Sequence, residues 1–154
     1  MGSHQFIMIL MIVVIIAIGI AGAIGVVQQQ GIQHEKKILD GLLFEAGSIL
    51  YEHFLLPTSY GGFGRSVPYM KENSDKVYAL LPTPVATLQS MLYMRGGFNH
   101  NGFRLKFWPN YWQKYAVGVH SLTYDFERWL LVHCSTGKME IKNKAPISSD
   151  FTKE

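Results

Sequence analysis

Residues 6–27 read FIMILMIVVIIAIGIAGAIGVV and contain no charged side chain and no proline. The hydrocarbon core of a bilayer is about 30 Å thick, and about 20 helical residues are needed to cross it. This run is therefore long enough to span a membrane, and no second stretch of the sequence resembles it. The sequence accordingly predicts two parts: a hydrophobic N-terminal helical segment, residues 1–28, and a globular head, residues 29–154.

Composition and charge limit the partners of the head. The 14 basic and 11 acidic residues are scattered, with no block of like charges, which argues against nucleic acid as a partner. The single cysteine, Cys134, cannot form an internal disulfide. Residues 1–5 contain no Lys or Arg, and the apolar run is longer than that of a signal peptide, so we expect the run to be retained.

The helical pattern continues beyond the apolar run. Apolar residues recur mostly at three- and four-residue steps, the period of a half-buried amphipathic helix. They are Ile32, Leu39, Leu42, Leu43, Ala46, Ile49, Leu50 and Phe54. Pro57 then ends the pattern. We expect one continuous helix over about residues 6–56, roughly 75 Å long, whose second half packs against the rest of the head.

The rest of the chain predicts turns and then strands. Residues 57–68 are rich in Gly, Pro and Ser and are expected to form a long connecting loop, because they lack the Gly-Lys-Ser/Thr ending of a phosphate-binding loop. Two-residue alternation predicts strands at 77–81, 103–107, 115–119, 130–134 and 139–141. The turns expected between them are 101–102, 109–110, 124–125 and 135–137, and residues 86–94 fit either a short helix or a strand.

These spacings leave no room for crossover helices, so the sheet is expected to be an antiparallel meander with one face on the long helix. The fold class that follows is α+β, with a long N-terminal helix packed by its second half on a C-terminal antiparallel sheet.

No constellation of residues predicts catalysis or metal binding. The six histidines include no pair at four-residue helical spacing. His133 and Cys134 are neighbours on one expected strand and point to opposite faces, so both cannot ligate one ion. We therefore expect no enzyme activity, metal or cofactor. Three interpretations remain for the aromatic residues of 107–115. Alternate members fill the core face of the sheet while the others rim a hairpin, or exposed members stack on sugar rings or form a contact between subunits.

The N-terminal half resembles that of type IV pilins. Residues 11–20, MIVVIIAIGI, are similar to a stretch common in that family, and the order of helix, loop and antiparallel sheet also agrees. A group of bacterial pilin-like proteins is more similar still, through residues 1–5 and the Pro-x-Ser-x-Gly-Gly pattern at 57–62. Type IV pilins have Glu as the fifth residue of the mature chain, whereas this sequence has Leu10 counted from Phe6, or Gln5 counted from Met1. The sequence therefore does not predict whether a leader peptide is cleaved or whether the N-terminus is methylated.

The resemblance implies a structural subunit of an extracellular, helical type IV pilus-like filament. The helix would first lie in the membrane, and assembly machinery would then transfer it into a homopolymer at the cell surface. Small residues let helices in lipid approach closely, and here they concentrate in the second half of the apolar run. The expected filament-core residues are Phe6, Leu10, Val14, Ala17, Gly19, Ala21, Gly22 and Gly25. Ser3, His4 and Gln5 would form a polar cluster and hydrogen-bond across subunits.

Two other classes of function remain. A single-pass accessory subunit of a larger membrane complex needs only one span and a docking domain. A membrane-tethered enzyme or sugar-binding module would depend on the aromatic run and the histidines alone.

Overall fold

The structure, a computed structural model, describes residues 2–81, 103–108, 111–121 and 124–152. These residues form an α+β arrangement that contains a long N-terminal helix and an antiparallel sheet of four strands, as the sequence predicted. The chain divides into two compact units, residues 1–37 and residues 38–154. The elements are α1 (Gly2–Leu55), η1 (Thr58–Tyr60), α2 (Val67–Glu72), α3 (Ser74–Leu80), β1 (Phe103–Trp108), β2 (Tyr111–Ser121), β3 (Phe126–His133), β4 (Met139–Lys142) and α5 (Ser148–Thr152).

Helix α1 has close to the expected bounds, starting at Gly2 and ending at Leu55, two residues before Pro57. Its part in the second unit, residues 38–55, buries one side completely. The buried side chains follow each other at steps of three and four residues, as expected of an amphipathic helix. They are Leu39, Leu43, Ala46, Leu50 and Phe54.

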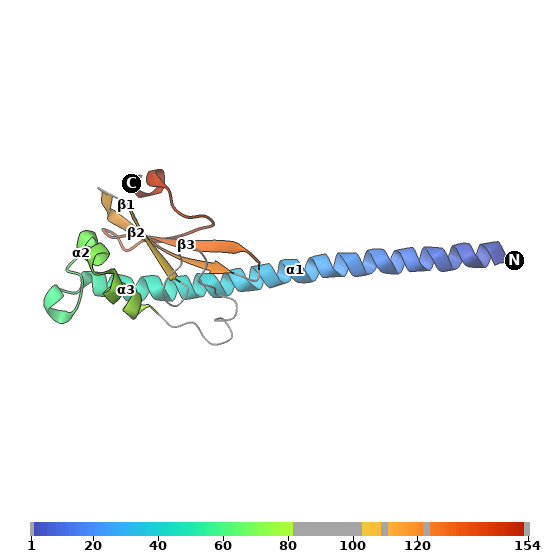
Figure 1. Ribbon diagram of the computed structural model, residues 1–154, viewed down its shortest axis with the longest axis horizontal. Helices are drawn as coiled ribbons and strands as arrows, with labels where there is room; N and C mark the ends of the chain where they lie inside the picture. The colour runs from blue at the N-terminus through green and yellow to red at the C-terminus, as the bar shows by residue number, and fades with distance from the viewer. Residues whose placement is uncertain (1, 82–102, 109–110, 122–123, 153–154) are drawn as a thin grey trace. The chain divides into compact units, whose positions relative to one another are not determined.

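The sheet is an antiparallel meander with strand order β1-β2-β3-β4, as predicted (Figure 1). In the register of β2 and β3, Gly118 lies opposite Trp129. A Cβ atom at Gly118 would lie 2.6 Å from the Trp129 ring, so only glycine leaves room for this indole. Alternate residues along each strand face opposite sides of the sheet, and the two sides have different partners.

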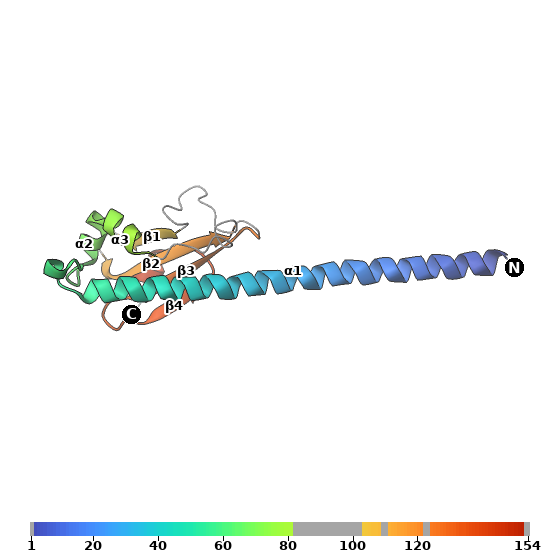
Figure 2. The same cartoon turned by 90° about the horizontal axis from the view of Figure 1, so that it is seen from below.

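One side of the sheet packs on residues 38–55 of α1 (Figure 2). Val117, Leu130 and Val132 belong to the same buried cluster as the apolar side of this helix segment. The guanidinium of Arg128 on β3 donates two hydrogen bonds of 2.7 Å to the carboxylate of Asp40. A bidentate pair of this kind fixes geometry as well as adding energy, so it aligns this part of α1 with the sheet.

The other side of the sheet is covered in part by α5, which the sequence did not predict. Phe151 of α5 is fully buried and packs with Trp129 and Leu131. The Trp108 ring stacks on the Phe151 ring with 6.1 Å between centroids. A helix of five residues has too short a pattern to be read from sequence, and its position comes from this aromatic contact.

Two further expectations need correction. Residues 77–81 were expected to form a strand, but residues 74–80 form α3, because the buried side chains of Val77, Tyr78 and Leu81 share one face of a helix. The expected loop at 57–68 contains η1 and the start of α2, whose first turn is capped by the Ser66 hydroxyl. The expectations for 86–94, 101–102 and 109–110 lie outside the described residues.

Candidate functional site

The apolar half of α1 is exposed all the way round. Every side chain from Phe6 to Val27 is exposed within the protomer, including Phe6 at 67% and Ile18 at 68%. A core helix of a soluble domain would bury at least one apolar side. Among the described residues, α1 is the helix long and apolar enough to cross a membrane. Its composition and exposure are compatible with membrane anchoring.

Six of the eight expected filament-core residues share one side of α1. Successive steps of four, four, three, four and four residues connect Phe6, Leu10, Val14, Ala17, Ala21 and Gly25. At 3.6 residues per turn these positions fall within about 100° of the helix circumference, and we call them the apolar stripe. Gly19 and Gly22 lie outside the stripe. Together with Gly25, which belongs to the stripe, they form a second row in which the residues are three positions apart. Large side chains occupy the N-terminal half of the stripe and small ones the other half.

The glycines of this segment face open space within the protomer. A Cβ atom added at Gly19, Gly22 or Gly25 would meet nothing within 4 Å. Each glycine in a helix interior costs about 1 kcal/mol relative to alanine in water. No contact among the described residues therefore accounts for glycine at these three positions.

The expected polar cluster occupies the first turn of α1. Ser3, His4 and Gln5 are all helical and exposed. No acidic residue lies in this turn, so no carboxylate balances the positive end of the helix dipole there.

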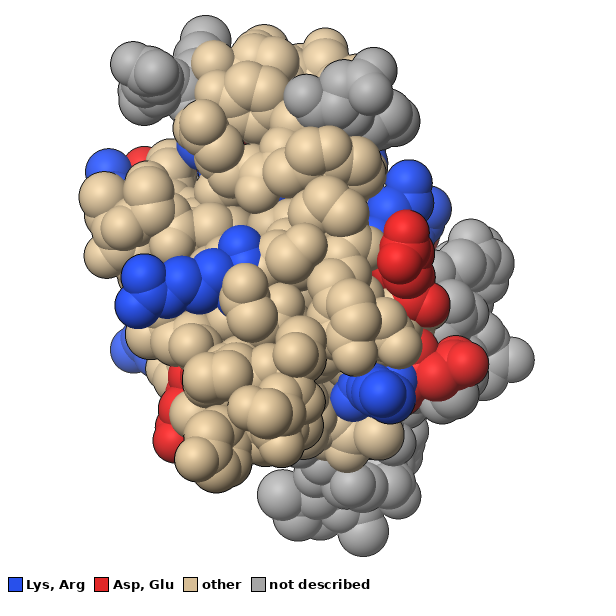
Figure 3. All heavy atoms as spheres, turned by 90° about the vertical axis from the view of Figure 1, so that its left-hand side faces the viewer, with Lys and Arg blue, Asp and Glu red and all other residues tan. Residues whose placement is uncertain are grey.

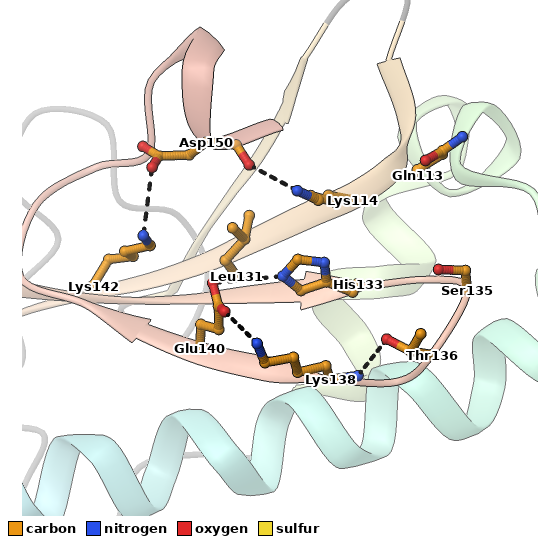
Figure 4. A pocket seen from close by; sticks show the side chains of 10 residues that line it. All are labelled: Gln113, Lys114, Leu131, His133, Ser135, Thr136, Lys138, Glu140, Lys142 and Asp150. Carbon is orange, nitrogen blue, oxygen red and sulfur yellow. Dashed lines mark hydrogen bonds and ion pairs between the residues drawn. The ribbon is translucent and has the colours of Figure 1, made fainter. Parts of the chain in front are cut away.

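The structure also shows a charged pocket that the sequence did not reveal. It lies on the side of the sheet that faces away from α1, between α5 and strands β2 to β4 (Figure 4). Its lining residues are Gln113, Lys114, Leu131, His133, Ser135, Thr136, Lys138, Glu140, Lys142 and Asp150. They come from four separate stretches of chain, so only the register of the strands brings them together. We call this site the charged pocket.

Both carboxylates of the charged pocket, those of Glu140 and Asp150, form ion pairs. Glu140 lies 2.9 Å from Lys138 Nζ and 3.5 Å from His133 Nε2. The hydrogen bond from Lys138 lowers the pKa of the Glu140 carboxyl, which keeps this group ionised. The Asp150 carboxylate lies 3.4 Å from Lys142 Nζ and also accepts a hydrogen bond of 2.9 Å from the Ile147 amide.

The aromatic residues of 107–115 pack inside the second unit. Phe107, Trp112 and Tyr115 contact the cluster on the α1 side of the sheet. Trp108 and Tyr111 contact the cluster on the α5 side. Tyr115 is fully buried and the other four rings are partly buried, which agrees with the interpretation in which alternate rings fill the core face.

His133 and Cys134 face opposite sides of the sheet, as predicted, although Cys134 lies in the turn one residue beyond the end of β3. His133 lines the charged pocket, whereas Cys134 packs against the cluster on the α1 side. Burial raises the pKa of the Cys134 thiol to about 12, and it also raises the pKa of the Tyr115 hydroxyl. A thiol held neutral in this way is a poor nucleophile. Within the described ranges, no three His, Cys, Asp or Glu side chains are grouped so as to hold a metal ion.

Comparisons of the chain with protein-family models, with curated proteins and with solved structures found no match.

Proposed function

We propose that this protein is a structural subunit of an extracellular, helical filament of the type IV pilus kind. The observation that carries the proposal is the fully exposed apolar half of α1. An apolar surface of this extent must be covered by lipid or by other chains, because water contact costs about 25 cal/mol per Å². In the proposed cycle lipid covers it before assembly, and identical helices cover it afterwards.

Transfer from lipid to a helical bundle gains little hydrophobic energy, so close packing must select the arrangement. The apolar stripe offers such packing, because a neighbour displaced along the helix axis would set its large side chains against the small ones. The row of Gly19, Gly22 and Gly25 beside the stripe offers a second place for close packing, since a second helix can approach the backbone there. Ser3, His4 and Gln5 would enter the bundle and hydrogen-bond with each other across subunits.

The proposal is tested by shearing native cells and imaging the released material by electron microscopy. Filaments are expected from the unaltered protein. Gly22→Leu should abolish them, because its side chain blocks helix approach where no glycine is needed within the protomer. Ile18→Leu is the matched control, since it keeps the volume and hydropathy of an exposed side chain on the same segment.

Two results would contradict the proposal. One is normal filament formation by Gly22→Leu, which would remove the packing argument. The other is a defined hetero-complex after detergent extraction, with no sheared filaments, which would identify a single-pass accessory subunit instead. The intact mass of the native chain shows in addition whether Met1 remains and whether a methyl group is present.

A further inference from the structure

We propose that the second unit binds an acidic sugar, that is, a saccharide ring that carries a carboxylate. The site is a pocket of about 510 Å³ on the α1 side of the sheet, a size that suits a small molecule. Its lining residues are Tyr51, Phe54, Leu55, Arg65, Trp112, Gln113, Cys134 and Ser135. They come from the end of α1, the loop before α2, the start of β2 and the turn after β3. We call this site the aromatic pocket, and its occupation by a ligand does not require filament assembly.

The carboxylate of the ligand is indicated by Arg65. The Arg65 side chain is exposed, and its guanidinium makes no ion pair, hydrogen bond or ring contact with any residue that the structure describes. No Asp or Glu lines the aromatic pocket, so its lining carries one uncompensated positive charge. An arginine fork binds a carboxylate through two parallel hydrogen bonds. One positive charge matches a carboxylate better than a phosphate group, which carries nearly two negative charges.

The backbone of Arg65 adds to this indication. Its φ of 58° is left-handed, a conformation in which most side chains are strained. The Arg65 amide donates a hydrogen bond of 2.8 Å to the Phe54 carbonyl at the end of α1, which helps to hold this conformation. Glycine or asparagine would adopt it with less strain, so the turn by itself does not explain an arginine here. A role for the guanidinium in the pocket does.

The ring of the ligand is indicated by two aromatic side chains, Tyr51 and Trp112, which both line the pocket and are partly exposed. The Tyr51 ring packs on Gly137, where a Cβ atom would lie 2.9 Å from it, and it stacks on Phe54 with 6.1 Å between centroids. The Lys71 ammonium group lies 5.6 Å from the centre of the Trp112 ring, a contact that helps to fix the indole. Rings held in this way offer apolar surface to one face of a sugar, and their polar atoms remain available to its hydroxyls.

Further polar groups match the hydroxyls of a sugar. The Gln113 amide and the Ser135 hydroxyl line the aromatic pocket, and both groups can donate and accept hydrogen bonds. The buried hydroxyl of Tyr115 has no hydrogen-bond partner among the described residues. Burial raises the pKa of Tyr115, and the nearby Cys134 and Tyr51 side chains, which line the pocket, raise it further. A ligand hydroxyl that enters between these two side chains would supply the partner that buried polar atoms normally have.

The test is calorimetric titration of the full chain, in a detergent without a sugar headgroup, with glucuronate and, separately, with galacturonate. Glucose and acetate are the controls, because glucose has the ring without the carboxylate and acetate has the carboxylate without the ring. Sodium chloride keeps the ionic strength equal in all titrations. We expect saturable binding with a dissociation constant of about 1 mM or below for at least one acidic sugar, and binding about tenfold weaker or more for both controls. Absence of saturable binding for both acidic sugars, or equally tight binding of a control, would overturn the proposal.

Two variants test the role of the guanidinium. Arg65→Asn should weaken binding of the acidic sugar about tenfold or more, because the fork is lost while asparagine accepts the left-handed backbone. Arg104→Gln is the matched control, since Arg104 is exposed and lies outside the pocket lining. Thermal unfolding confirms that both variants fold. Equal affinities for Arg65→Asn and the unaltered chain, or equal losses in the two variants, would also overturn the proposal.

Tryptophan fluorescence tests the contact with the aromatic ring. The acidic sugar should change the emission of the unaltered chain, because Trp112 lines the pocket. Trp112→Phe should remove this change, since the other two tryptophans, Trp108 and Trp129, lie outside the lining. An emission that the acidic sugar leaves unchanged in the unaltered chain, or a change of the same size in Trp112→Phe, would contradict binding at this site.

Discussion

The thiol of Cys134 shows how burial decides the chemistry of one residue. Burial raises its pKa to about 12, so at pH 8 only about 1 in 10⁴ molecules carries the reactive thiolate. A thiol in the unfolded chain has a pKa of about 8.5 and is about a thousand times more often ionised. We therefore expect alkylation by iodoacetamide to be about a thousandfold slower in the folded protein, with a rate that keeps rising with pH up to about 12.

Mass spectrometry of samples taken over time measures both rates, and the same protein in denaturant is the control. Comparable rates in the folded and unfolded chains would mean that the thiol is not held neutral.

The sequence predicted which side of the sheet a residue faces, but it did not predict which residues lie beside it on the neighbouring strand. The opposite orientations of His133 and Cys134 follow from the two-residue period of any strand, so they could be predicted. The pairing of His133 with Lys114 depends on the register of β2 and β3, which a one-residue shift would change completely. For this reason the sequence did not predict the charged pocket: it contains Lys114 and His133, but it does not show that they lie opposite each other.

The turn after α1 is the element whose geometry depends most on glycine. Residues 54–64 carry no charge. Figure 3 views the protein from the side on which α1 ends, and uncharged side chains cover much of the surface on that side. The chain folds back so that the Phe63 and Gly64 amides donate hydrogen bonds to carbonyls near the end of the helix, those of His53 and Leu56. These bonds satisfy acceptors that a helix end otherwise leaves free. Gly61 has a φ of 79°, the left-handed conformation that favours glycine.

Gly62→Ala should destabilise this turn. A Cβ atom at Gly62 would collide with the backbone carbonyl of Leu56, which cannot move without breaking the hydrogen bonds of the turn. We expect the free energy of unfolding to fall by about 2–3 kcal/mol. Gly41→Ala is the control, because that site in α1 has open space and should gain about 0.5–1 kcal/mol.

Thermal unfolding followed by tryptophan fluorescence measures both changes, since all three tryptophans of the chain lie in the second unit. A Gly62→Ala variant as stable as the unaltered protein would show that the turn can rearrange without loss.

Elements were predicted where one hydrophobic pattern extends over many residues. Helix α1, with 54 residues, and strand β2, with 11, have such patterns, and the meander followed from the short spacings between strands. The error at α3 arose because Val77 and Leu81 fit both a strand and a four-residue helical step, and a segment of this length cannot separate the two. Neither α5 nor the charged pocket has a local signal, since both depend on contacts between distant parts of the chain.

At the scale of the molecule, the core belongs entirely to the second unit. Every member of the main buried cluster lies between Leu39 and Val132, and the second cluster extends to Phe151. The apolar side chains of 6–27 contribute to neither cluster. A chain of residues 29–154 should therefore fold without lipid, keep Trp129 buried and remain monomeric, because it has lost the surface proposed for assembly.

Size-exclusion chromatography and tryptophan fluorescence in detergent-free buffer measure these properties, with the full chain in detergent as the reference. The expected unfolding midpoint is close to that of the full chain, because the buried contacts of the second unit are unchanged. The truncation tests directly whether the head is stable without residues 1–28. A head that needed these residues would aggregate, or its tryptophan emission would shift to that of an unfolded chain. A filamentous product would be equally decisive, because it would move the assembly surface from α1 to the head.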